Sequence, residues 1–354
     1  MSEDDEADGA TLPHPRETLQ FFGHEEAERA LLEAYRSGRM PHAWLIGGPQ
    51  GIGKATLAYR AARFVLAHPD PGSPGVKSAQ SLALPPDHRI ARLVAAQGHP
   101  DLLVLDRRAD DEGKVPTVIP VERVRKLLAF LGSTPREAGW RVVIVDSADE
   151  LNVQGANTML KLVEEPPQRA LILIVSHAPG RLLATIRSRC RRLALRPLPA
   201  SDVARAVSAA LGDAEEAAVQ KAAAASEGSV ARAIALMGGP LLAIRERVIE
   251  LLDRLPSTDP RALHALGESL ERADRVVLAT FVDAVRDWLS ARLARDLSAS
   301  GAPRGGMPPG RGPARLAQAW QDINTAALDA EMYNLERKPL VFKMFGSLAE
   351  AVRG

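Results

Sequence analysis

The stretch Gly48-Pro49-Gln50-Gly51-Ile52-Gly53-Lys54-Ala55 has the glycine and lysine spacing of a phosphate-binding loop. It follows an apolar run at residues 43–46 and precedes an apolar-periodic segment at residues 56–67. In this strand–loop–helix order the glycines let backbone N–H groups converge on an anion, and the helix dipole favours negative charge. We therefore predict that Gly48, Gly51, Gly53 and Lys54 form a nucleotide-type phosphate loop.

The position after the loop lysine departs from this pattern. A serine or threonine there places a hydroxyl on the magnesium ion beside the β- and γ-phosphates, but this chain has Ala55. Thr56 lies about 100° further round the helix, which makes it a poor substitute. The loop is thus predicted to be degenerate.

The end of a predicted strand, at Asp146 and Ser147, supports this interpretation. The aliphatic run at residues 142–145 ends in Asp146, where a buried strand of a nucleotide-binding sheet presents a carboxylate to magnesium through water. Active ATPases of this type follow the aspartate with a glutamate that polarises the attacking water, and this chain has Ser147. Asp146 therefore reads either as a degenerate Walker B acid or as a solvated strand cap.

Later segments contain polar groups beside apolar runs. Ser176 ends the aliphatic run at residues 171–175, where a sheet would present a polar group to a γ-phosphate. Arg187 and Arg189 flank Ser188, next to the only cysteine, Cys190. The arginines are either surface charges or groups that stabilise phosphate across a subunit interface, and Cys190 reads as a small buried apolar residue.

The bulk composition narrows the classes of protein. The chain has 354 residues, a net charge of +1 and 46% hydrophobic residues, which fits two or three globular domains rather than a polycation. One cysteine excludes an internal disulfide framework and a cysteine-rich zinc site. No run approaches the ~18 apolar residues of a membrane span, so we expect a cytoplasmic protein without membrane partners.

Two regions differ in pattern along the chain. Residues 43–197 alternate between aliphatic runs and amphipathic segments, which predicts a doubly wound α/β domain with a parallel sheet. The expected strands cover residues 43–46, 102–105, 141–145, 171–175 and 192–195. The expected helices cover residues 54–67, 121–131, 152–163 and 179–186. Residues 69–86 are expected to form a long loop. After residue 197 the chain is predicted to be helical, with a flexible loop at residues 298–313.

The chain resembles the AAA+ clamp-loader subunits of bacterial DNA polymerase III across residues 18–197. The segments that carry the resemblance are Thr18–Phe22 with Gly23-His24, Pro41-His42-Ala43, the phosphate loop, His99-Pro100-Asp101, Leu160–Pro167 and the phrase at residues 182–190 ending in Ser188-Arg189-Cys190. Within that family it is similar to the delta-prime type. The gamma/tau motor type keeps Ser or Thr after the loop lysine and an Asp-Glu pair.

The resemblance implies a domain organisation. It predicts an AAA+ P-loop α/β domain at residues 17–197, after residues 1–16, whose own acidic composition predicts a disordered lead. A three-helix lid domain follows at residues 198–240, and an all-α collar domain for oligomerisation at residues 241–354.

The resemblance also implies a role. A delta-prime subunit does not turn over ATP, and joins motor and delta subunits in a heteropentameric ring that loads the sliding clamp on primer–template DNA during replication. Arg189 would act in trans as an arginine finger at a neighbour's ATP. Such a chain is not catalytic alone but serves the DNA polymerase holoenzyme, a nucleotidyltransferase.

The positions at which this chain differs from the clamp-loader pattern determine which cofactors we expect. Many relatives have a four-cysteine zinc module in the region of residues 69–98, and this chain has none, so we expect no zinc and no other metal. We expect no tightly bound nucleotide and leave open weak binding of ATP or ADP at Lys54. Arg232 comes one residue later than the nucleotide-sensing lid arginine of the motor subunits, which leaves its role open.

Two alternatives remain from the sequence. One is an ATP-hydrolysing motor subunit of the gamma/tau type, against which Ala55 and Ser147 argue. The other is a stand-alone P-loop kinase or NTPase, which leaves the helical C-terminal third and Arg189 unexplained.

Overall fold

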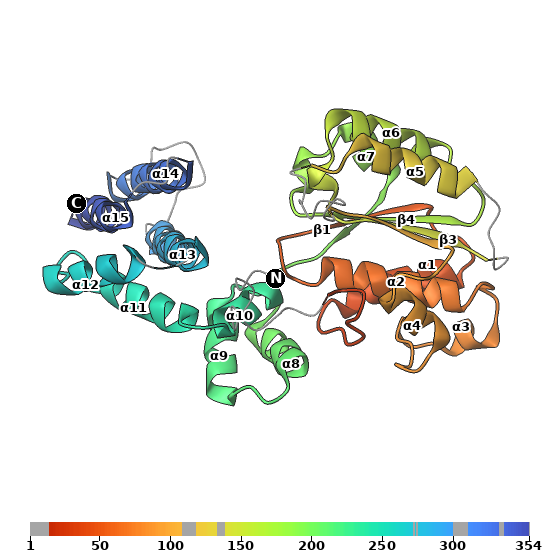
Figure 1. Cartoon of the computed structure of the whole chain (residues 1–354), viewed down its shortest axis with the longest axis horizontal. Coiled ribbons are helices and arrows are strands. Elements are labelled where there is room, and N and C mark those ends of the chain that lie inside the picture. Colours follow the sequence, from red (N-terminus) through yellow and green to blue (C-terminus); the bar gives the residue numbers. More distant parts are fainter. Residues whose placement is uncertain are drawn as a thin grey trace, which may run out of the picture. The chain divides into compact units, whose positions relative to one another are not determined.

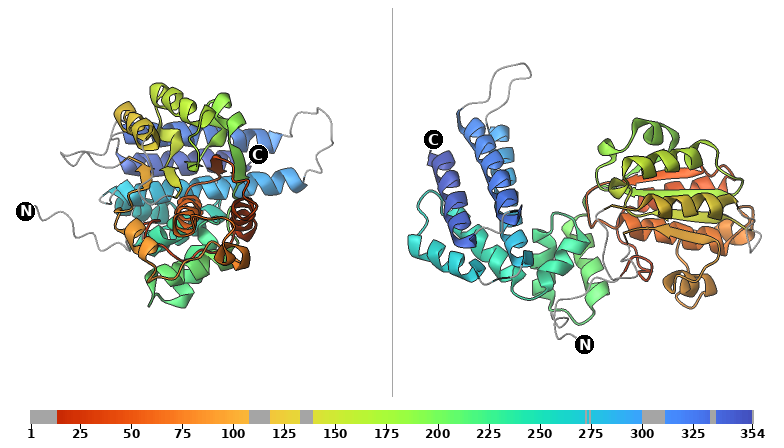
Figure 2. Two further views of the ribbon diagram at one scale, coloured as in Figure 1. Left: turned by 90° about the vertical axis from the view of Figure 1, so that its right-hand side faces the viewer. Right: turned by 45° about the horizontal axis from the view of Figure 1, so that its top comes forward.

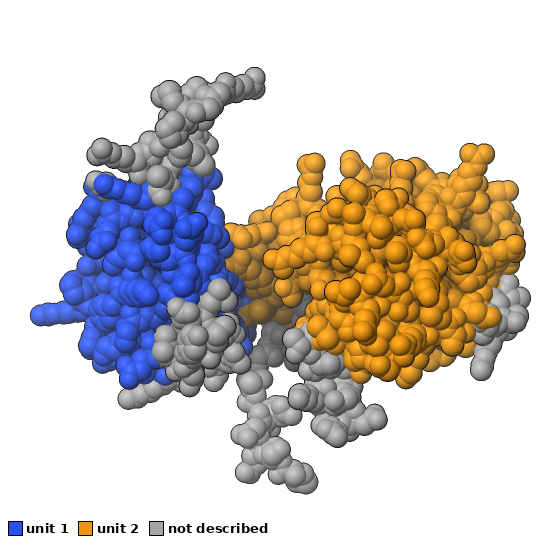
Figure 3. All heavy atoms as spheres, turned by 90° about the horizontal axis from the view of Figure 1, so that it is seen from above, with its two compact units in different colours: residues 1–9, 236–354 blue, residues 10–235 orange. Residues whose placement is uncertain are grey.

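The computed structural model describes residues 14–107, 118–132, 139–271, 273, 275–299, 311–332 and 336–353. These residues form two compact units, taken in chain order. The first covers residues up to Ala235 (orange, unit 2 in Figure 3), and the second begins at Leu236 (blue, unit 1 in Figure 3). The predicted acidic lead lies almost entirely outside the described residues, as does the middle of the predicted loop at residues 298–313. The domain boundaries at residues 197 and 240 stay predictions.

A five-stranded parallel sheet is the centre of the first unit. Its strands are β1 (Ala43–Gly47), β2 (Leu102–Leu105), β3 (Arg141–Val145), β4 (Ala170–Ser176) and β5 (Arg191–Ala194). They lie in the order β2-β3-β4-β1-β5. Every residue of β1, β3 and β4 is buried, as expected for parallel strands covered on both faces. This confirms the predicted α/β fold class with a parallel sheet.

Two layers of helices cover the sheet (Figure 1). One layer comprises α1 (Glu25–Arg36), α2 (Lys54–Ala67), α3 (Pro74–Ser78) and α4 (Arg89–Ala95). The other comprises α5 (Val121–Gly132), α6 (Val153–Glu164) and α7 (Ala184–Arg189), with the 3-10 turns η1 (Ala148–Glu150) and η2 (Pro179–Arg181). The right-hand view of Figure 2 shows the sheet between these layers.

Strand alternation divides the core between the two layers. In β4, Leu171, Leu173 and Val175 pack on the α1–α2 side, whereas Ile172 and Ile174 pack on the α5–α6 side. This is the period-two pattern of a strand buried on both faces. It explains why the aliphatic run is continuous rather than alternating.

The helical prediction for residues 179–186 is wrong in detail. The η2 turn ends at Arg181, Leu182 and Leu183 are extended, with ψ angles of 152° and 132°, and α7 begins only at Ala184. The predicted loop at residues 69–86 likewise contains the short helix α3. Its start is explained by Pro74 at the first helical position, where proline's fixed φ angle is favourable.

In the described residues after β5, the chain forms helices and no further strand. The first unit ends with α8 (Ala200–Leu211), α9 (Glu216–Ala225) and the start of α10 (Val230–Met237). The second unit contains α11 (Leu241–Asp253), α12 (Pro260–Glu271), α13 (Arg275–Ala299), α14 (Arg311–Met332) and α15 (Arg337–Arg353). Within it α13 packs against α11 and α14, and α15 packs against α12 and α14. This confirms the helical C-terminal part of the predicted fold.

A buried ion pair holds the segment between α2 and β2 in place. The carboxylate of Glu28 accepts hydrogen bonds from Arg60 Nε at 2.6 Å and from the backbone N–H of Leu82 at 2.8 Å. Arg60 also donates to the carbonyl oxygen of Leu19 at 2.6 Å. Charge-assisted hydrogen bonds from α1 and α2 therefore position this segment. It is the segment in which the absence of cysteines led us to expect no zinc.

We predict that Glu28→Ala lowers the free energy of unfolding by about 3 kcal/mol, because it leaves the Arg60 guanidinium and the Leu82 N–H buried without their acceptor. Urea unfolding followed by tryptophan fluorescence measures the effect. Glu33→Ala, an exposed carboxylate on the same helix, is the matched control and should change stability by less than about 0.5 kcal/mol. Equal unfolding midpoints for the two variants would contradict a role for the pair.

Candidate functional site

The phosphate loop joins the carboxyl end of β1 to the first turn of α2. Gly48, Gly51 and Gly53 have φ angles of 150°, 76° and 96°. A Cβ atom on Gly51 would lie 2.2 Å from Ser229 Oγ, and one on Gly48 would lie 2.4 Å from the carbonyl oxygen of Leu195. Glycine is thus required at these two positions by both backbone angle and space.

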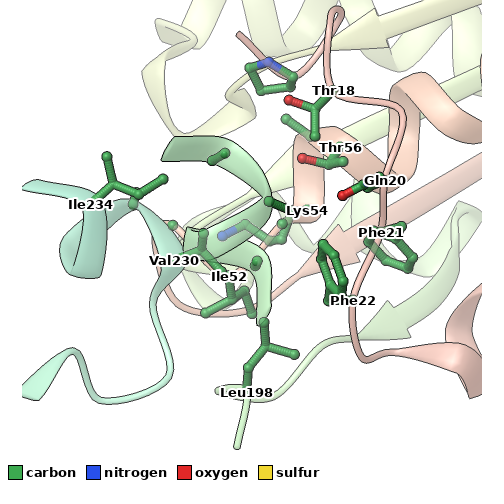
Figure 4. A pocket seen from close by; sticks show the side chains of 18 of the residues that line it. Thr18, Gln20, Phe21, Phe22, Ile52, Lys54, Thr56, Leu198, Val230 and Ile234 are labelled. Atoms are coloured by element: carbon green, nitrogen blue, oxygen red, sulfur yellow. The ribbon is translucent and has the colours of Figure 1, made fainter. Parts of the chain in front are cut away.

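The loop lines a cavity of about 670 Å³ inside the first unit. Figure 4 shows the segment Thr18–Phe22 on one side, Lys54 in the middle, Val230 and Ile234 on the other side, and Leu198 at the bottom. The backbone N–H of Ala231 donates a hydrogen bond to the carbonyl oxygen of Gly51 at 3.2 Å. The start of α10 therefore contacts the phosphate loop directly.

Buried arginines of α2 shape the N-terminal side of this cavity. Arg63 donates to the carbonyl oxygens of Arg16 at 2.9 Å and Thr18 at 2.7 Å. Burial, together with the nearby charge of Arg60, lowers the pKa of Arg63 to about 10. These bonds fix the backbone of residues 16–19 without using any group of the phosphate loop.

Lys54 lies almost fully buried at the floor of the cavity, with 3% of its surface exposed. Its ammonium group donates a hydrogen bond to the carbonyl oxygen of Pro49, within the same loop. Burial lowers the pKa of Lys54 to about 8, although the carboxylates of Asp146 and Asp149 oppose the shift. Lys54 is therefore bound to its own loop, and its pKa lies closer to neutral pH than that of an exposed lysine.

Asp146 follows β3 and lines the same cavity. Its pKa is raised to about 6, mainly by burial and also by the carboxylates of Asp106 and Glu150, while the charge of Lys54 opposes the shift. The neighbouring Ala55 also lines the cavity and has no oxygen with which to ligate magnesium. Thr56 does line the cavity, and Figure 4 shows it beside Gln20, on the side of the N-terminal segment.

The hydroxyl groups of Ser147 and Ser176 face a different carboxylate. Asp149 accepts hydrogen bonds from Ser147 Oγ at 3.1 Å and Ser176 Oγ at 2.8 Å, and from the backbone N–H groups of His177 and Ala178 at 2.5 and 3.1 Å. Burial alone would raise the pKa of Asp149, but these bonds lower it. Both serines are thus used to hold the turn after β3 against the end of β4.

Val175 of β4 and His177, which directly follows β4, line the cavity, and Ser176 does not. Our expectation for Ser176 was wrong, because Ser176 is fully buried against Asp149. The strand alternation could have revealed this: Val175 faces α2, so His177, two residues later, faces the same side. Burial and the charge of Lys54 lower the pKa of His177, while Asp149 opposes them.

Arg189 lies outside this cavity, at the end of α7. Its side chain is 41% exposed and contacts Glu164 Oε1 at 3.0 Å and the carbonyl oxygen of Thr185 at 3.1 Å. Arg187 instead donates to the carbonyl oxygens of the η2 turn, at 3.4 Å for Pro179 and 3.0 Å for Gly180. Of these two arginines, Arg189 is therefore the more exposed, and it does not line the cavity of the chain's own phosphate loop.

Cys190 and Arg232, which the sequence analysis also singled out, do not line the cavity. Cys190 is buried, and burial raises the pKa of its thiol to about 11, which keeps it unreactive. Arg232 forms an ion pair with Glu227 at 3.1 Å and is not among the residues that line the cavity.

Within the described part of the chain, no cluster of three or more His, Cys, Asp or Glu side chains could hold a metal ion. None of the helices described combines the length and apolar character that crossing a membrane requires.

Comparison with known proteins identifies the family. A family model described as "DNA polymerase III, delta subunit" matches residues 23–199, half of the chain. DNA polymerase III subunit delta-prime of Escherichia coli K12 is 31% identical over 288 residues, covering 76% of this chain and 81% of that protein. The delta-prime subunit of Pseudomonas aeruginosa is 35% identical over 215 residues, covering 60% of this chain and 61% of that protein.

A gamma/tau subunit of DNA polymerase III from Mycobacterium tuberculosis is also similar, at 31% identity over 186 residues. That match covers 52% of this chain and only 29% of the gamma/tau protein, so the similarity to delta-prime extends further along both sequences. The chain therefore belongs to the DNA polymerase III delta-prime family.

Proposed function

We propose that this chain is a non-hydrolysing subunit of a DNA polymerase III clamp loader. In that role it joins motor subunits of the gamma/tau type and a delta subunit in a ring, and the ring loads a sliding clamp on primer–template DNA. The delta-prime relatives support the clamp-loader role.

The observation that carries the proposal is the separation of two sets of groups. The chain's own cavity has Ala55 where magnesium needs a hydroxyl, and the Ser147 hydroxyl donates to Asp149. Arg189 is exposed and lies outside that cavity. This arrangement suits a chain that does not hydrolyse ATP but supplies an arginine finger to the ATP of a neighbouring motor subunit.

We further propose that the cavity holds no tightly bound nucleotide. Lys54 is the cationic side chain with which the loop would bind phosphate, and its ammonium group is already bound to Pro49. Binding of ATP or ADP is therefore expected to be weak and independent of magnesium, because magnesium has no protein hydroxyl to ligate.

Arg189→Ala should leave assembly intact and slow ATP hydrolysis at the adjacent motor site by about 10³-fold, the size of effect that a missing arginine finger has. Single-turnover hydrolysis in the assembled complex measures it, because one motor site among several should lose its fast phase. Arg181→Ala, also exposed, is the control and should behave as the unmodified chain. An unchanged fast phase with Arg189→Ala would contradict the finger assignment.

Ala55→Ser should not turn the isolated chain into an ATPase. The new hydroxyl restores a magnesium ligand, but Ser147 stays bound to Asp149 and no glutamate polarises the attacking water. Phosphate release by the purified variant, with and without magnesium, checks this. Magnesium-dependent turnover at rates typical of such motors would instead support the motor alternative.

ADP binding detected by equilibrium dialysis should weaken as the pH rises from 7 to 9. Lys54 has a lowered pKa of about 8, so its positive charge, which attracts phosphate, is lost through this range. The dialysis is done with and without magnesium, and Lys54→Met is the matched variant, whose affinity should not change with pH in the same way. Affinity that is independent of pH, or that requires magnesium, would contradict this description of the cavity.

A further inference from the structure

The ends of α6 and α7 are joined by the ion pair between Glu164 and Arg189. We propose that Glu164 is a positioning residue, which holds the Arg189 guanidinium in the orientation that meets a neighbour's triphosphate. This inference rests on the proposed function. It adds to the arginine finger, Arg189, a second residue that orients it.

The guanidinium is held from two directions. Arg189 Nη2 contacts Glu164 Oε1 at 3.0 Å, and Nη1 donates to the carbonyl oxygen of Thr185 at 3.1 Å. A guanidinium has five N–H donors in a planar fork, so these contacts leave donors for a phosphate oxygen. The two anchors thus fix the plane of the fork without using up its donors.

The pair is accessible rather than part of the core. The side chains of Arg189 and Glu164 are 41% and 40% exposed. An exposed pair of this kind contributes little to the stability of the fold. Its effect is instead on the flexible arginine side chain, since restraining a group before it binds reduces the entropy lost when it does bind.

Helix stability does not explain an acid at position 164. Glu164 is the last residue of α6, where the negative end of the helix dipole disfavours a carboxylate. Arg189 is the last residue of α7, where the dipole favours its positive charge. The ion pair with Arg189 offsets this unfavourable charge at the end of α6.

The adjacent residue provides a matched control. Glu165 is also acidic and exposed and lies at the C-cap of α6. Among the described residues, the Arg189 guanidinium contacts Glu164 and Thr185 and not Glu165. Replacing either glutamate by glutamine removes one charge from the same helix end, but only Glu164→Gln alters the pair.

The test uses the full chain assembled with its motor and delta subunits, and measures single-turnover ATP hydrolysis over a range of ATP concentrations. Glu164→Gln should lower kcat at the adjacent site by about two- to fivefold, as expected for an exposed charge pair, with little change in KM. Glu165→Gln should match the unmodified complex. Glu164→Gln in the Arg189→Ala background should cause no further loss, because Glu164 acts through Arg189.

The outcomes separate the inference from the function on which it rests. Full activity of Arg189→Ala would overturn both. A slow Arg189→Ala with an unaffected or faster Glu164→Gln would overturn only the inference, and a faster variant would mean that Glu164 competes with phosphate. Equal losses from Glu164→Gln in both backgrounds would also overturn it, since the effect would then not pass through Arg189. Thermal unfolding of Glu164→Gln, expected to be unchanged, checks that the fold is intact.

Discussion

The burial of β1, β3 and β4 on both faces is the constraint on which the first unit depends. These strands are aliphatic throughout and have no solvent-facing side, so helices must cover the sheet from both directions. Because the strands are parallel, their carboxyl ends meet at one edge, where polar residues follow each apolar run. The phosphate loop, Asp146 and His177 reach one cavity for this reason.

Ala55 and Ser147 lie near this edge of the sheet, at positions where an active nucleotide site has other residues. The loop keeps its glycines and its lysine, so the backbone shape is that of a nucleotide site, while Ala55 and the bound Ser147 remove the groups that would use magnesium and water. Lys54 is explained in part by its bond to Pro49, which makes it a component of the loop itself. A burial-lowered pKa is the cost of keeping a lysine there. The scaffold is thus preserved where its chemistry is not.

The sequence predicted the sheet well because each strand is a short aliphatic run bounded by polar or turn residues. It failed at residues 182–183, where two leucines favour a helix but the chain stays extended before α7. It also assigned Ser176 to the cavity, although counting alternate residues from Val175 indicates His177. The contact between Glu164 and Arg189 joins two helix ends 25 residues apart in sequence, and no local pattern predicts such a pair.

The most direct test of the proposed division of labour is to mix the purified chain with the motor and delta subunits and to measure both assembly and ATP hydrolysis. We expect one stoichiometric complex by gel filtration and no ATP turnover by the chain alone. In the presence of clamp and primed DNA, the mixture with this chain should turn over ATP faster than the mixture without it. A chain that stays outside the complex, or that hydrolyses magnesium-ATP by itself at motor rates, would contradict the proposal.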